Sequence, residues 1–120
     1  MVRKLEDPRK PLSRAVVHIL LALADGARHG YAIKQEVEAR TGGSIRLGPG
    51  TLYEAIQRLE ESGLIHEGDA VEEPVNGQAA QRRYYALTDR GWTVLRDELK
   101  QLGAIVDHAR TNPRLRKGLA

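Results

Sequence analysis

The 120-residue chain contains no cysteine and no phenylalanine, and only one methionine and one tryptophan. Without cysteine it can form neither a disulfide framework nor a reactive thiol, which suits a reducing compartment such as the cytoplasm. Four tyrosines are the only other aromatic residues, so the core has to be built from Leu, Ile, Val and Ala. The length predicts one domain with room for an appended helix.

Long apolar runs are also missing. The longest, residues 15–24, is interrupted by His18 and is too short to cross a bilayer. The first eleven residues place charges and two prolines where a signal peptide would need an apolar stretch. We therefore expect a cytoplasmic protein without a membrane span.

Signals for catalysis or metal binding are weak. The four histidines are scattered, without a pair at the spacing of metal ligands, and His18 fits a core or interface position better. Residues 48–51 lack the lysine and the spacing of a phosphate-binding loop. No serine has a neighbour that suggests an activated nucleophile. We expect no enzyme, and neither a metal nor a cofactor.

The net charge of +3 is unevenly distributed. Residues 1–10 hold four cations against two acids, and residues 110–120 hold four cations and no acid. The two ends therefore carry +6 and the middle of the chain −3. Basic ends often contact nucleic acid or another anionic surface, but they can also serve only solubility.

The first predicted helix covers residues 12–24. Ser13 can cap its start, because a serine oxygen accepts a backbone N–H that has no partner within the helix. Its apolar residues form two stripes, which suits one side packed on the core and another packed on a partner chain. The second stripe consists of Val17, Leu21 and Ala24.

Two more helices follow. One is predicted over residues 30–40, and its inward side chains are expected to be Tyr31, Ile33 and Val37. The other is predicted over residues 49–62, with a proline in its first turn and Gly63 just past its end. Its inward face, at helical spacing, is Leu52, Ala55, Ile56 and Leu59.

The apolar pattern then changes. Residues 64–68 and 83–87 are predicted strands, and residues 69–82 between them hold Pro74 and the turn-forming pair Asn76-Gly77. The two strands make a hairpin with a polar tip, whose length suggests mobility in the absence of a partner.

A last helix is predicted from residue 89 to about 110, capped by Thr88 and stopped before Pro113. Its apolar residues recur at alternating spacings of three and four, as in a heptad seam. They are Trp92, Leu95, Leu99, Leu102, Val106 and Ala109. The seam predicts a dimer interface together with Val17 and Leu21, and the alternative is a lone amphipathic helix packed on its own domain.

This order of elements predicts a mainly α protein with a small β-hairpin: a winged helix-turn-helix with a C-terminal dimerisation helix. The predicted parts are a basic N-terminal arm (residues 1–11), a DNA-binding domain (12–88), the dimerisation helix (89–110) and a basic tail (111–120). In a helix-turn-helix, the second helix of the pair enters the major groove of DNA. Residues 49–62 are the candidate for that role.

The outward face of this helix is expected to be Gly50, Thr51, Tyr53, Glu54, Gln57, Arg58 and Glu61. Arg58 can bond guanine and Gln57 can bond adenine, while Gly50 lets the backbone approach the duplex. Glu54 is an awkward neighbour for DNA, although a carboxylate can accept from cytosine N4.

Arg82 and Arg83 on the returning side of the hairpin suit phosphate or the minor groove. Acids on the incoming side oppose this: Glu67, Asp69, Glu72 and Glu73. A protein-interaction module of the same fold is the alternative, and Glu54, Glu60 and Glu61 support it.

Several short stretches occur in the order found in the PadR family of transcriptional regulators, which the chain resembles over roughly residues 12–99. They are His29-Gly30-Tyr31, Gly50-Thr51-Leu52-Tyr53, Arg58-Leu59-Glu60, Gly63-Leu64-Ile65, Arg83-Tyr84-Tyr85 and Leu87-Thr88-Asp89-Arg90-Gly91. The resemblance implies a small, subfamily-2-like dimeric repressor that binds double-stranded DNA and is often released by a small molecule. It suggests that Tyr31, Thr51 and Tyr53 help to hold phosphates or bases. The family usually has proline where this chain has Glu54.

One branch of that family binds flat aromatic compounds between paired tryptophans at the dimer interface. Trp92 is the single tryptophan of this chain. We interpret it first as a residue of the core or the dimer interface, with a platform for a small-molecule effector as the alternative.

Overall fold

The structure is a computed structural model that describes residues 10–68, 71–75 and 78–119. Its helices are α1 (Arg14–Ala24), α2 (Gly30–Arg40), α3 (Pro49–Glu61), α4 (Asp89–Ala109), α5 (Pro113–Arg116) and the 3-10 helix η2 (Lys117–Leu119). Its strands are β1 (Arg28–His29), β2 (Ile65–Glu67), β3 (Val71–Val75), β4 (Gln78–Arg82) and β5 (Tyr84–Leu87). Most of the predicted N-terminal arm, together with Asp69 and the Asn76-Gly77 pair, lies outside the described residues.

The four predicted helices are confirmed, with boundaries within two residues of the predicted ones, and so are the predicted caps. Ser13 Oγ accepts from the backbone N–H of Val16 at 3.1 Å, and Thr88 Oγ1 accepts from that of Gly91 at 3.0 Å. Gly63 follows α3 with a φ of 76°, the left-handed conformation that glycine adopts readily. These local signals decide where each of the three helices α1, α3 and α4 begins or ends.

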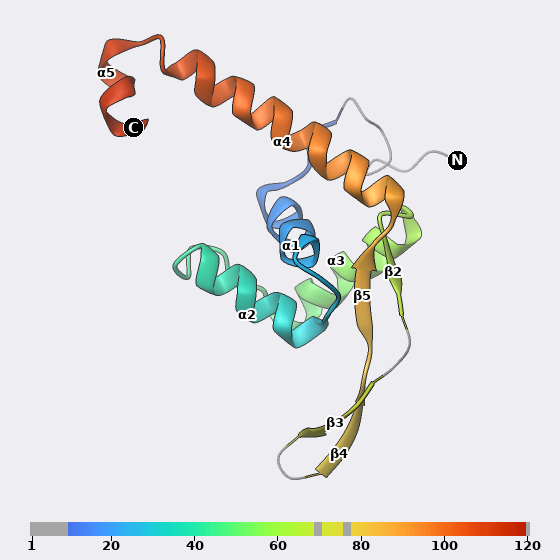
Figure 1. Cartoon of the computed structure of the whole chain (residues 1–120). Helices are drawn as coiled ribbons and strands as arrows, with labels where there is room; N and C mark the ends of the chain where they lie inside the picture. Colours follow the sequence, from blue (N-terminus) through green and yellow to red (C-terminus); the bar gives the residue numbers. More distant parts are fainter. Residues whose placement is uncertain (1–9, 69–70, 76–77, 120) are drawn as a thin grey trace.

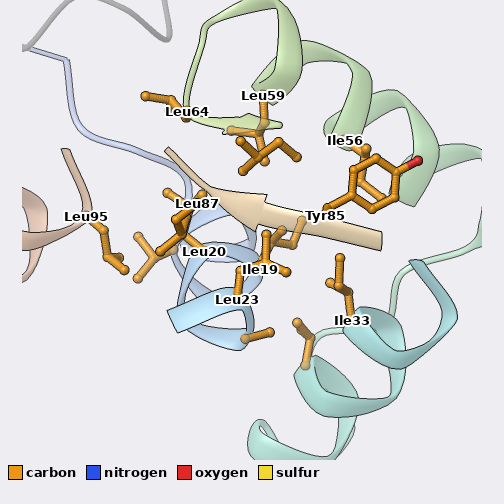
Figure 2. Close-up of a cluster of buried hydrophobic side chains, with 14 of the residues drawn as sticks. Ile19, Leu20, Leu23, Ile33, Ile56, Leu59, Leu64, Tyr85, Leu87 and Leu95 are labelled. Atoms are coloured by element: carbon orange, nitrogen blue, oxygen red, sulfur yellow. The ribbon is translucent and has the colours of Figure 1, made fainter. Parts of the chain in front are cut away.

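The core lies between the helices and strand β5. Ile19 and Leu20 of α1, together with Leu59 of α3, have no exposed surface. Figure 2 shows β5 passing between α1 and α3, with Tyr85 and Leu87 reaching into the same cluster. Leu95 joins from the first turns of α4. The prediction of a largely aliphatic core is confirmed, whereas the prediction that Tyr31 points inward is wrong, because its side chain is 53% exposed.

Strand β5 is the centre of a three-stranded antiparallel sheet with the order β1-β5-β2. Arg28 and His29 of β1 pair with Tyr85 and Tyr84, and β2 pairs along the other edge of β5. Strand β1 was not predicted, because two residues are too few to show an alternating pattern. The arrangement of this sheet beside α2 and α3 confirms the winged helix-turn-helix fold.

The predicted polar tip is a second pair of strands. Strands β3 and β4 pair antiparallel and extend the wing away from the helices (Figure 1). Pro74 stands opposite Ala79 in this pair. Proline is tolerated where a strand has a free edge, but it removes a strand signal from the sequence. Periodicity therefore predicted a loop where the chain forms strands.

Helix α4 follows β5, crosses α1 and extends beyond the other elements (Figure 1). The whole molecule measures 56 Å along its longest axis. Residues 103–108 on the outer half of α4 are all exposed. The predicted basic tail folds into α5 and η2, because Asn112 Oδ1 accepts from the N–H of Arg114 at 2.9 Å. Pro113 ends α4 as predicted, but it also begins α5, where its missing N–H is no loss.

Gly91 lets the first turn of α4 lie directly against the backbone of Leu64, between α3 and β2. A Cβ at this position would overlap the carbonyl oxygen of Leu64. We expect Gly91→Ala to lower the free energy of unfolding by at least about 2 kcal/mol, because the clash is with backbone. Thermal and urea unfolding measure the loss.

Gly103→Ala is the matched control in the same helix. Nothing lies within 4 Å of a Cβ at Gly103, so alanine should raise stability by up to about 1 kcal/mol through its helix propensity. Equal effects of the two substitutions would show that α4 does not approach Leu64 this closely.

Candidate nucleic-acid interface

The predicted outward face of α3 is open to solvent. Its inward residues Leu52, Ile56 and Leu59 are at most 2% exposed, whereas Tyr53 is 54% exposed. All seven residues of the predicted outward face are exposed: Gly50, Thr51, Tyr53, Glu54, Gln57, Arg58 and Glu61. No other part of the described chain covers this face, so a duplex could reach it.

An ion pair crosses the middle of this face. Arg58 Nη2 lies 3.1 Å from Glu54 Oε1, one helical turn away, and both side chains are 66% exposed. Such exposed pairs contribute little to stability. The pair does, however, offset the charge of Arg58, which is the single arginine of α3.

Tyr53 connects α3 with the start of α2. A Cβ on Gly30 would lie 3.1 Å from its hydroxyl oxygen, so the tyrosine ring packs directly on the glycine. Tyr31 follows that glycine, and its side chain is also about half exposed. The two tyrosines therefore lie at the junction of α2 and α3, and about half of each residue is exposed there.

His29 joins the wing to the start of α2. Its Nδ1 accepts the backbone N–H of Ala32 at 3.1 Å and lies 3.2 Å from Arg82 Nη1. Its ring meets that of Tyr84 edge to face, with centroids 5.4 Å apart. This role could not be predicted from residue type, since histidine is an uncommon helix cap. Only the place of His29 before the helical pattern could have indicated it.

The two predicted wing arginines have different surroundings. Arg82 is half-buried beside His29, whereas Arg83 is 73% exposed and pairs with Glu67 at 3.2 Å. Burial and repulsion from Glu67 raise the pKa of Glu60, and Arg83 opposes the rise. The acids at the wing root therefore weaken the positive potential at Arg83.

An apolar groove of about 490 Å³ runs between α1 and α4. It is lined by Leu21, Ala24, Trp92, Leu95, Arg96, Leu99 and Lys100. Trp92 is 42% exposed on its wall. Along the same side of α4, Trp92, Leu99 and Val106 are exposed at intervals of seven residues.

The residues predicted for a dimer interface fall into three groups. Val17 and Leu95 are buried in the core of their own chain, and Leu21 and Leu102 are half-buried. Trp92, Leu99 and Val106 are exposed. In the single chain, part of the heptad seam is therefore used by the domain itself, and the exposed remainder continues along α4.

Two polar groups stand out beyond these surfaces. Glu98 is a buried carboxylate that accepts the backbone N–H of Leu12 at 3.2 Å, which fixes the chain's entry into α1. His18 Nδ1 is buried without a hydrogen-bond partner in the described chain. Burial, and then the cations of Arg40 and Arg14, lower the pKa of His18. The role of Glu98 was not predicted, because nothing in the sequence distinguishes this residue from a surface glutamate.

Within the described residues, no three histidine, aspartate or glutamate side chains come together as metal ligands. Among the same residues, no helix combines the length and the apolar character that a bilayer crossing requires.

One family model matches about two thirds of the chain. The family described as "Transcriptional regulator PadR-like family" matches residues 19–97. The transcriptional regulator Rv3488 of Mycobacterium tuberculosis is 38% identical over 95 residues, which cover 78% of this chain and 81% of that protein. An uncharacterized 37.1 kDa protein in transposon TN4556 of Streptomyces fradiae is 38% identical over 87 residues, 72% of this chain but 22% of that protein's length.

Among solved structures, Bacillus subtilis PadR in complex with operator DNA is similar, with a TM-score of 0.59 and 25% identity. The similarity covers 70% of this chain and 45% of that one.

Proposed function

The chain belongs to the PadR-like family of transcriptional regulators, and from this premise we propose that it is a homodimeric, sequence-specific DNA-binding repressor. The observation that carries the proposal is the exposed face of α3, with Gln57 and Arg58 directed away from the core. The similar Bacillus protein is one whose structure holds operator DNA.

Each part of the surface has a role in this proposal. Gln57 and Arg58 read base edges in the major groove. Thr51, Tyr31 and Tyr53 bind the phosphate backbone of the DNA, because hydroxyls donate to phosphate oxygens. Arg82 and Arg83 direct the wing toward the neighbouring phosphates or the minor groove.

Selection of bound sequences from a random duplex pool tests the proposal. We expect an inverted repeat whose half-sites lie about one helical turn, ~34 Å, apart, because a two-fold axis relates the two α3 helices. Binding should also weaken steeply with salt as counterions are released. A chain that selects no sequence, and whose random-duplex binding ignores salt, would instead be a protein-interaction module.

Variants locate the contacts in the same assay. Arg83→Gln should weaken binding to all sequences and reduce the slope of log K against log salt by about one. Arg96→Gln removes the same charge in the α1–α4 groove and should leave the slope unchanged. If both variants behave alike, the wing does not contact phosphate.

The homodimer rests on the apolar side of α4. Leu99 is 38% and Val106 is 37% exposed, and the groove beside them offers Leu21 and Trp92. A second copy of the chain carries the same apolar surface and can cover it in an isologous contact. Such a contact removes apolar surface from water, which is the main driving force for association.

Val106→Asp should convert the dimer into a monomer, because an unpaired carboxylate would be buried in the interface. Sedimentation equilibrium measures the change. Gln101→Asp adds the same charge on the opposite side of α4 and should leave the dimer intact. A wild-type monomer, or a dimer that tolerates both changes equally, would refute this interface.

The α1–α4 groove is also the place we propose for a small-molecule effector. Its walls are apolar, and Trp92 offers an aromatic face for stacking. Arg96 and Lys100 line the same groove, so a neutral or anionic planar aromatic compound fits it better than a cationic one.

Trp92 fluorescence reports binding directly, since it is the single tryptophan of the chain. We expect a planar aromatic acid to quench its emission at lower concentration than a planar cation of similar size. Lys100→Gln should weaken the acid's effect severalfold and leave that of a neutral compound unchanged. Stronger quenching by the cation, or no quenching by any of the three classes, would contradict an effector site of this chemistry.

A further inference from the structure

Glu54 occupies the centre of the exposed face of α3. At about 100° per residue, it lies roughly 140–160° around the helix from each of the buried residues of that helix. These are Leu52, Ile56 and Leu59. A helix that presents this face to the major groove therefore brings the Glu54 carboxylate to the base edges.

The major groove offers a carboxylate few partners. An ionised carboxylate only accepts hydrogen bonds, and the groove's donors are the amino groups of cytosine and adenine. Adenine also presents its N7 acceptor beside the amino group, which would face the second carboxylate oxygen. Cytosine presents a donor alone. Opposite guanine or thymine the desolvated carboxylate would find no donor on the base, and opposite adenine its second oxygen would face N7, so each of these bases disfavours the complex.

Arg58 supplies the complementary half. Its guanidinium lies 3.1 Å from the Glu54 carboxylate, and five N–H donors leave it able to bond a base as well. In a C·G base pair, the cytosine amino group donates to guanine O6 over about 2.9 Å, so donor and acceptor stand side by side in the groove. The spacing of the ion pair matches this edge: carboxylate to cytosine N4, guanidinium to guanine O6 and N7.

We propose that Glu54 is a specificity-determining residue that, together with Arg58, reads a single C·G base pair in each half-site. The inference rests on the proposed function, since it assumes that α3 enters the major groove. Glu54 adds selectivity and not affinity, because its charge is repelled by phosphates at every sequence. Without Glu54, Arg58 could bond a guanine whether or not a cytosine amino group lies beside the Glu54 position.

The test compares wild type, Glu54→Gln and Arg58→Gln in selection from a random duplex pool, followed by titration of single-base variants of the selected site. We expect both substitutions to relax the same base pair, by roughly tenfold in relative affinity. The double variant should lose no more discrimination there than either single one, since the residues act as a unit. Glu54→Gln should also bind random duplex more tightly than wild type.

Glu36→Gln is the matched control, because Glu36 forms an ion pair of the same i,i+4 kind with Arg40 at 2.9 Å on α2. It should leave every position of the selected site unchanged. Melting curves check folding, and loss of an exposed pair should hardly move them.

The possible failures are distinguishable. If wild type selects no sequence, the proposed function fails and this inference fails with it. If wild type selects a site but Glu54→Gln keeps its full stringency, or relaxes a base pair other than the one relaxed by Arg58→Gln, the inference alone is wrong.

Discussion

Thr88 joins the end of the wing to the segment after α3 and to the first turn of α4. The Thr88 hydroxyl donates to the carbonyl of Gly63 at 2.6 Å, just past α3, and accepts from the N–H of Gly91 in the first turn of α4. Its backbone N–H donates to the carbonyl of Leu64 at 3.1 Å. One residue thus ends the wing, starts α4 and fixes the end of α3. The helix proposed to read DNA and the helix proposed to dimerise are therefore joined through this one residue.

Much of this architecture could be predicted because local chemistry specifies it. Ser13 and Thr88 mark the starts of α1 and α4, and Gly63 marks the end of α3. The spacing of Leu52, Ile56 and Leu59 distinguishes the buried side of α3 from its exposed side. The seven outward residues of that helix could therefore be named from the sequence alone. The same reasoning separates its exposed face from the core without any knowledge of the neighbouring elements.

What could not be predicted depends on contacts between distant segments. Strand β1 exists because β5 pairs with it, and strands β3 and β4 form by pairing with each other although Pro74 removes the strand signal from the sequence. Helical spacing predicted that Tyr31 would point into the core. In the structure the Tyr53 ring covers the adjoining Gly30, and Tyr31 is exposed. The burial of Leu95 in its own domain, which removes part of the heptad seam from a partner's reach, likewise follows from where α4 crosses α1.

The pairing of β1 with β5 ties the sheet of the wing to the start of α2. Arg82 at the base of the wing lies against His29, and His29 caps α2, so the wing is fastened to the helix pair at its root. Contacts within the chain therefore set the position of the wing root relative to the helix pair, and a duplex held as proposed would have to fit that spacing.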